Sequence, residues 1–184
     1  MKAIMPLLAL CLVAPCLAEQ QAVTTGPYEI SFDLGIPKAS YSVDVSAPKT
    51  IYTPAGLWSM VGETITEYQI NIINDIKTGG ITITLFEFPT DRVSFSPSEL
   101  ASRAKSMMEK VPQIRDVQES ARMIRGSNGG MASGKIEIGF GLYQDIYSVI
   151  YIPDARLVVS MVSTYPWDGG THQLLKTIYV QKNA

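Results

Sequence analysis

The chain's only histidine lies in the segment STYPWDGGTH, residues 163–172, beside groups that could assist hydrolysis. A serine hydrolase needs an imidazole within reach of a hydroxyl and a carboxylate that orients the imidazole. Ser163, His172 and Asp168 supply one group of each kind within ten residues. The types and spacing of these residues therefore raise the possibility of acyl-transfer chemistry.

The surroundings of the same segment favour a structural interpretation. No Gly-x-Ser-x-Gly elbow occurs anywhere in the chain, so the serine lacks the strained turn that exposes a nucleophile. Pro166 ends an apolar strand, and Gly169 and Gly170 are typical of a turn. We therefore expect a corner between a strand and a helix, with Asp168 or Thr171 capping the helix.

Metal and cofactor chemistry has little support in the sequence. A single histidine excludes the usual zinc ligand sets, because Cys11 and Cys16 both lie in the first 18 residues, and no calcium-loop motif is present. Folding could still bring distant carboxylates such as Glu87, Glu137 and Asp145 together for calcium or glycoside chemistry, but any β protein carries such residues on its solvent faces. We expect no cofactor and no metal.

A glycine-rich segment, GSNGGMASGK at residues 126–135, resembles a phosphate-binding loop that ends in Lys135. Such a loop needs the lysine to lead into a helix, so that backbone amides and the helix dipole meet the anion. Here the lysine is followed by the strand-like IEIGF. We predict a hairpin turn in place of a phosphate site.

The segment PAGLWSMVG, residues 54–62, is unusually apolar for a connection between two strands. It either covers one end of the core or presents an anchor for a partner, because Trp and Met are favoured at interface hot spots. The second alternative gives our binding hypothesis. In it, a ligand or partner surface includes Leu57, Trp58, Met60 and Trp167.

Apolar and polar residues alternate along the first half of the chain, which predicts strands with one buried face. The alternating segments are 28–34, 41–45, 66–72 and 81–88. The turn-forming residues between them predict two hairpins, one from the first two segments and one from the last two.

The second half begins with a helix signal. Ser96 is a good N-cap, Pro97 suits the first helical position, and Glu99 can complete a capping box. An apolar stripe extends the helix to about residues 97–111. The following segments are expected as strands at 117–124, 134–140, 146–152 and 157–164, with a short helix at about 170–177 and a final strand.

Together these segments predict an α+β fold, with an antiparallel β-sheet built from hairpins and the two helices packed on it. Residues 1–18 have the basic start, apolar run and small-residue end of a signal peptide. Alternatives are an uncleaved anchor or a lipid on Cys16. Residues 19–27 are expected as a flexible leader and 28–184 as a single domain.

Charge and hydropathy limit the partners. The formal net charge of −2, without a basic block, excludes a typical nucleic-acid binder. Beyond the first 18 residues no segment is apolar enough to span a membrane. A signal peptide implies a protein that acts in a secreted or extracytoplasmic location.

From Ser96 to Val180 the order of the predicted elements resembles the PsbP/Mog1 fold family. The matching segments are SPSELASRAKSMMEKV, VQESARMIRGSNGGMASGKIEI, YSVIYIPDARLVVSMVSTYP and HQLLKTIYV. The resemblance covers about half of the chain and contains no invariant motif. It implies an antiparallel sheet with helices on its faces, accessory or binding work, and no shared catalytic residues.

These observations predict an exported, non-catalytic binding or accessory domain whose partner is an extracytoplasmic protein or small ligand. A structural component of a cell envelope or surface layer is the alternative. A secreted hydrolase is the third hypothesis.

Overall fold

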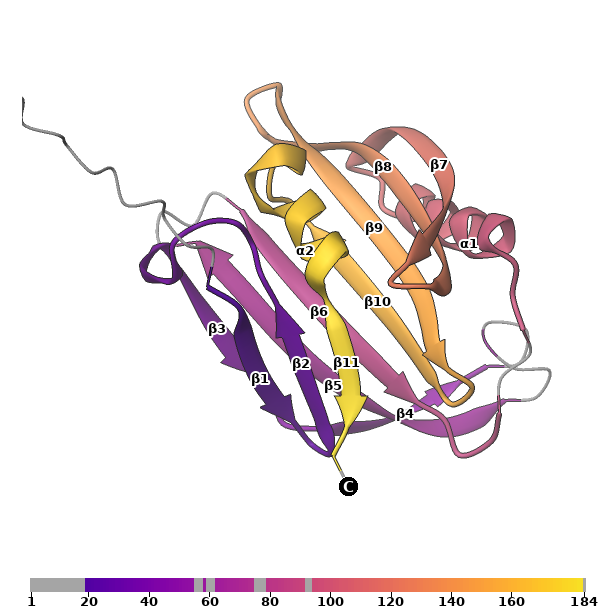
Figure 1. Cartoon of the computed structure of the whole chain (residues 1–184). Coiled ribbons are helices and arrows are strands. Elements are labelled where there is room, and N and C mark those ends of the chain that lie inside the picture. Colours follow the sequence, from indigo (N-terminus) through magenta and orange to yellow (C-terminus); the bar gives the residue numbers. More distant parts are fainter. Residues whose placement is uncertain (1–18, 55–57, 59–61, 75–78, 92–93, 184) are drawn as a thin grey trace, which may run out of the picture.

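Antiparallel sheets with two short helices make up the structure, a computed structural model (Figure 1). It describes residues 19–54, 58, 62–74, 79–91 and 94–183. The strands are β1 (Gln21–Thr25), β2 (Tyr28–Phe32), β3 (Tyr41–Val45), β4 (Lys49–Thr53), β5 (Glu63–Asn74), β6 (Gly80–Glu87), β7 (Ile114–Ile124), β8 (Ser127–Gly139), β9 (Leu142–Asp154), β10 (Leu157–Ser163) and β11 (Tyr179–Lys182). The helical segments are the 3₁₀ turn η1 (Lys38–Ser40), α1 (Pro97–Glu109), the π-helical turn η2 (Trp167–Thr171) and α2 (His172–Thr177).

The larger sheet has eight strands. Seven follow the order β3-β5-β6-β10-β9-β8-β7, and β4 pairs with the N-terminal half of β5 while β3 pairs with its C-terminal half. β9 and β10 lie at its centre, joined by the tight turn that the sequence PDAR predicts. Both strands are apolar on nearly both faces because both faces are covered.

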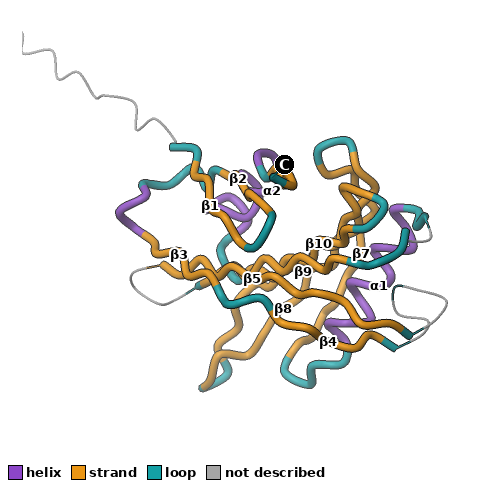
Figure 2. The backbone as a smooth tube through the Cα atoms, turned by 90° about the horizontal axis from the view of Figure 1, so that it is seen from below, coloured by secondary structure: helices purple, strands orange, loops and turns teal. Residues whose placement is uncertain are grey.

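The smaller sheet, in the order β1-β2-β11, covers one face of the larger sheet together with α2 (Figures 1 and 2). We call this the front face. The alternating residues of β2 and β5 meet there, including Ile30, Phe32, Ile70 and Ile72, which are almost completely buried.

Two predictions for the first half are corrected by this arrangement. β2 and β3 do not form a hairpin, since β2 pairs with β1 and β11 while β3 pairs with β5 in the other sheet. Alternation specifies that a strand buries one face, but both sheets offer such a face. The expected leader 19–27 contains β1, which pairs with β2 over five residues.

Helix α1 lies against β7, β8 and β9 on the opposite, back face of the larger sheet. The glycine-rich segment makes this contact possible, because an added Cβ at Gly130 would clash with the backbone nitrogen of Ala101. The predicted hairpin forms between β7 and β8, but most of the glycine-rich segment belongs to strand β8 and not to the turn. Only Arg125 and Gly126 turn the chain, and β8 begins at Ser127.

The start of α1 is confirmed in detail. The Ser96 side chain accepts a bond from the Glu99 backbone, and the Glu99 carboxylate accepts one from the Ser96 backbone at 2.7 Å. The predicted apolar stripe is only partly buried, since Leu100, Ala104 and Met108 face the sheet whereas Met107 is 37% exposed. Among the described residues, no helix is long and apolar enough to cross a membrane.

Candidate binding surfaces

The two tryptophans of the binding hypothesis lie on opposite faces of the larger sheet. Trp58 belongs to the back core under α1, and Trp167 packs against the front core. They do not line one common surface. Leu57 and Met60, the other two residues of that hypothesis, lie outside the described residues.

Trp58 is 3% exposed, so its indole acts as a buried support. The ring meets Phe95 edge to face with 6.4 Å between centroids, and the Arg103 guanidinium lies 5.5 Å from the Trp58 centroid. At Trp58, this burial agrees with core cover and not with an exposed anchor. The indole can still form the inner wall of a surface hollow.

Such a hollow does adjoin Trp58. A groove of about 440 Å³ lies between β4, β5 and the C-terminal half of α1. Its residues are largely apolar, and two large apolar side chains among them remain open to solvent, Tyr52 at 69% and Met107 at 37% exposure. We call it the back groove; its lining is Ile51, Tyr52, Thr53, Pro54, Trp58, Ile65, Glu67, Phe86, Met107 and Lys110.

One buried polar atom behind the wall of the back groove lacks a partner among the described residues. Thr53 is 3% exposed, and its hydroxyl has no hydrogen-bond partner among the described residues. A buried hydroxyl without a partner costs about 1–3 kcal/mol. The apolar walls of the groove therefore cover one unsatisfied hydrogen-bonding group.

Trp167 has a different environment, a cluster of stacked rings at the corner after β10. It stacks on His172 with 4.9 Å between ring centroids, tilts against Tyr147 at 5.3 Å, and has the Arg122 guanidinium 4.8 Å from its centroid. These contacts hold the only histidine against an indole. Trp167 is therefore partly buried, and its ring stabilises the corner by packing.

The hydroxyls of this corner are also engaged. Ser163 is fully buried and its Oγ shares a 2.7 Å hydrogen bond with Thr171, whose hydroxyl reaches the Tyr165 carbonyl at 2.8 Å. Neither Asp168 nor Thr171 makes the predicted side-chain cap, since no cap hydrogen bond is present at α2 or η2. Thr171 ties the corner to β10 instead.

A second hollow of about 480 Å³ opens at the end of the molecule where the two sheets separate. We call it the intersheet cleft; Tyr28, Thr64, Thr66, Glu87, Asp154, Arg156 and Lys182 form its polar lining. Glu87 joins the sheets, because its carboxylate accepts bonds from Lys182 on β11 at 2.6 Å and from Tyr68 on β5 at 3.0 Å.

The pKa values in this cleft follow from the same contacts. Burial and the hydrogen bond to Glu87 raise the pKa of Tyr68 to about 12, and the same two causes raise the pKa of Tyr28. Burial opposes ionisation of Glu87, but bonds from Lys182, Tyr68 and Tyr28 together hold the pKa of its carboxyl below the ordinary value. Neutral tyrosines thus donate to an ionised glutamate.

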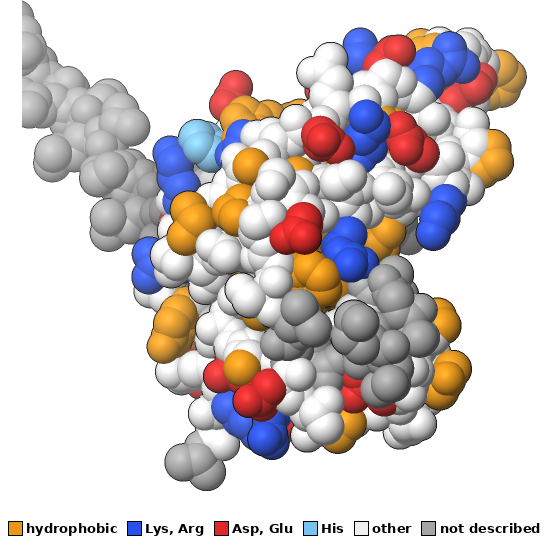
Figure 3. Space-filling model, turned by 90° about the vertical axis from the view of Figure 1, so that its right-hand side faces the viewer, with side chains coloured by type: hydrophobic (Ala, Val, Ile, Leu, Met, Phe, Trp, Pro, Cys, Tyr) orange, Lys and Arg blue, Asp and Glu red, His pale blue; other side chains and the backbone are white. Residues whose placement is uncertain are grey.

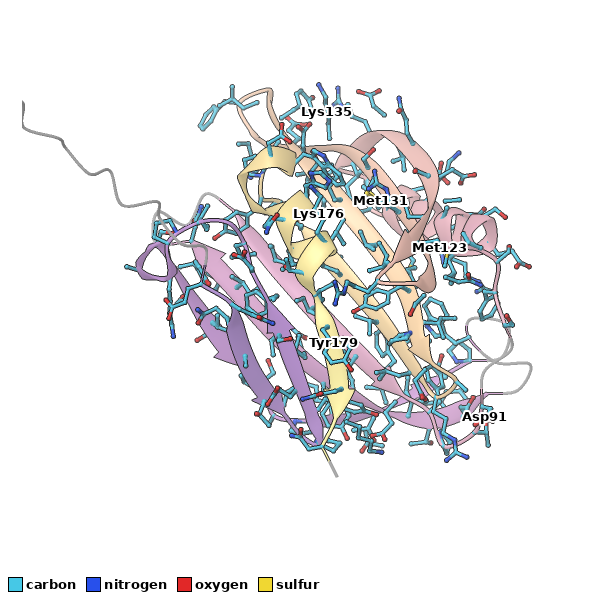
Figure 4. All side chains as sticks on the ribbon, in the orientation of Figure 1. Asp91, Met123, Met131, Lys135, Lys176 and Tyr179 are labelled. Atoms are coloured by element: carbon cyan, nitrogen blue, oxygen red, sulfur yellow. The ribbon has the colours of Figure 1, made fainter. Side chains whose placement is uncertain are left out.

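The charges at the mouth of the intersheet cleft are likewise paired. Arg156 donates to Asp91 at 2.8 Å, and the Asp154 carboxylate accepts the Arg156 backbone N–H. Asp91 lies at the lower edge of the molecule (Figure 4). This cleft is therefore a clamp between the sheets whose polar groups satisfy one another.

Among the described residues, no group of three or more His, Cys, Asp or Glu side chains is arranged to hold a metal ion. Neither a known protein-family model nor a curated protein sequence matches the chain. The candidate site therefore depends on geometry alone. The sequence analysis identified Trp58 but missed Tyr52 and Met107. Met107 could have been found, because the apolar stripe of α1 contains more apolar residues than one face of the helix can bury.

Proposed function

We propose that the chain is an exported binding domain that seats an apolar side chain of an extracytoplasmic protein in the back groove. The observation that carries this proposal is the exposure of Met107 beside a wall of buried Trp58, in a hollow that Tyr52 of β4 also lines. Exposed aromatic and methionine side chains beside a hydrophobic hollow are typical of protein interfaces.

The openness of the groove favours a protein partner over a small ligand. A small-molecule pocket encloses most of its ligand, whereas the ring of Tyr52 stands mostly in solvent. A segment of a protein can fill the groove with one side chain and cover the rim with its neighbours.

The charges around this side of the molecule support apolar recognition. Glu67 and Lys110 bring one charge of each sign to the groove. Figure 3 shows Lys and Arg side chains intermixed with Asp and Glu over the visible surface beside α1. Because positive and negative charges are mixed on this surface, they attract a charged partner only weakly. The apolar side chain of the partner therefore supplies most of the affinity.

Export and fold class belong to the same proposal. The apolar run and small-residue end of residues 1–18 support a cleaved signal peptide. The antiparallel larger sheet, with α1 on one face and α2 on the other, supports an α+β domain of the PsbP/Mog1 type. An accessory role at the cell surface or outside the cell follows from both.

Site-specific photocrosslinking tests the proposal. A benzoylphenylalanine placed at position 52 should crosslink a discrete protein in the native envelope, and the same probe at position 179 on β11 should not. Tyr179 is a matched control because it is 50% exposed on the opposite side of the molecule. Met107→Ser should reduce the crosslink at position 52 by about tenfold.

Three results would overturn it: no adduct at position 52, identical adducts at both positions, or an adduct that Met107→Ser leaves unchanged. An adduct with twice the mass of the chain would identify a second copy as the occupant. That result would favour the alternative function, a structural component of an envelope or surface layer.

A further inference from the structure

Three exposed apolar side chains gather at the hairpin between β8 and β9. Phe140 at its tip is 106% exposed, Ile138 is 59% exposed and Leu142 is 61% exposed. The hairpin extends beyond the rest of the described fold at the top of Figure 1. We call Ile138, Phe140 and Leu142 the apolar tip.

The backbone of the apolar tip is unfavourable for phenylalanine. Phe140 has φ of +53° and lies between Gly139 at +108° and Gly141 at +73°. Two successive turn residues with positive φ follow the pattern of a type I′ hairpin, in which Asn, Asp and Gly are preferred. A bulky side chain in this region is an outlier, and such outliers concentrate at functional positions.

The area of the tip argues against a protein occupant. At about 200 Å² for a whole side chain of this size, the three exposed side chains present on the order of 400 Å². Stable protein interfaces bury roughly 800 Å² on each partner, about twice this area. A second copy or a partner would need a large additional surface, and the narrow hairpin offers none.

A lipid bilayer needs no complementary surface, because its hydrocarbon surrounds an inserted tip on every side. The residues behind the tip suit the interface between hydrocarbon and water. Tyr143 carries the Arg115 guanidinium 4.2 Å from its ring centroid, and Arg115 lies 3.8 Å from Glu137. Amphipathic aromatics and long basic side chains occupy this depth in membrane proteins.

We propose that the β8–β9 hairpin inserts its apolar tip into the interfacial layer of a membrane. The neck behind the tip has two basic residues, Arg115 and Lys135, against three acidic ones, Asp116, Glu137 and Asp145, so it forms no basic patch. Attachment therefore depends on apolar contact, and salt has little influence on it. A tip of three side chains binds weakly and reversibly, as a single short lipid anchor does. This inference does not rest on the back groove.

Tryptophan scanning tests the insertion directly. In the full chain, Phe140→Trp should add emission that vesicles of brominated phosphatidylcholine quench, whereas the added emission of Tyr179→Trp should not be quenched. Tyr179 lies on β11, far from the hairpin end that Lys135 marks in Figure 4. Quenching reports the contact of each introduced tryptophan with lipid. The comparison of the two positions is therefore valid even if residues 1–18 also bind the vesicle.

A second variant separates attachment from folding. Phe140→Asn places a preferred residue at the strained position, so thermal stability should stay equal or rise. The vesicle contact of the tip, measured by protection of the β8–β9 hairpin amides from hydrogen exchange, should fall by about tenfold. Met107→Ser in the back groove should leave this protection unchanged, which keeps a failure here distinct from a failure of the proposed function.

Equal quenching at positions 140 and 179, or no quenching at either, would overturn the proposal. So would loss of hairpin protection in 0.5 M salt as compared with a low-salt buffer. If the chain self-associates without lipid and Phe140→Asn abolishes the association, the tip binds a second copy and the membrane proposal is wrong.

Discussion

The back groove and the intersheet cleft have similar volumes and opposite chemistry. In the cleft, Glu87 is bonded by Lys182 and Tyr68, and Arg156 is bonded to Asp91. At the groove, Tyr52 and Met107 stay exposed, and the buried Thr53 hydroxyl has no partner among the described residues. The size of a hollow therefore says less about binding than whether its own groups satisfy one another.

This contrast separates a structural role from a binding role. Substitutions in the cleft should lower the free energy of unfolding without changing partner binding. Substitutions at the groove rim should do the reverse, while its buried wall should affect both properties.

The wall of the groove has the largest expected effect. Trp58→Ala should lower the free energy of unfolding by about 3–5 kcal/mol, because it removes a buried indole and leaves a cavity beside Phe95. Urea denaturation measures the loss. A cost below about 1 kcal/mol would show that the 54–62 segment does not support the core.

The contact between α1 and the sheet at Gly130 has the second-largest expected effect on stability. Gly130→Ala should cost about 2–3 kcal/mol, since the new Cβ would meet the Ala101 nitrogen and the Leu100 carbonyl carbon and push α1 from the sheet. Gly169→Ala is the matched control, because its nearest neighbour is the Pro166 Cβ at 3.3 Å. Equal losses in thermal melts of the two variants would contradict this packing.

In the cleft, Glu87→Gln should cost about 1 kcal/mol at pH 7, because charge-assisted bonds become neutral ones and the Lys182 side chain is 58% exposed. The folded-state pKa of Glu87 lies below its ordinary value of 4.5, so its contribution is present above pH 4.5 and is lost as the pH falls through the folded pKa. Denaturation at pH 7 and pH 3 should therefore show a difference that shrinks in acid. A constant difference would assign the loss to packing.

The groove rim should have the smallest effect on stability. The double substitution Tyr52→Ser and Met107→Ser should change the free energy of unfolding by about 0.5 kcal/mol or less, because both side chains are exposed. The same variant should lose the partner crosslink described above. Retained crosslinking would remove the distinction between the groove and the cleft.

Local sequence signals predicted the helices and strands better than they predicted which strands pair with each other. The capping box at Ser96 and the strands predicted at 146–152 and 157–164, which lie in β9 and β10, were readable because they depend on residues close in sequence. The pairing of β2 was not readable, since its alternating residues suit either sheet. Gly130 was misread for a related reason, because glycine permits both a turn and the close approach of a helix.

The sequence by itself determined the alternation that builds both sheets, the start of α1 and the apolar character of residues 54–62. Only the tertiary structure decided which apolar residues stayed exposed. It buried Trp58, left Tyr52 and Met107 at a groove, and placed Phe140 at a free hairpin tip. The physical reason is that periodicity specifies which residues share a face, whereas exposure depends on how far neighbouring layers extend across that face.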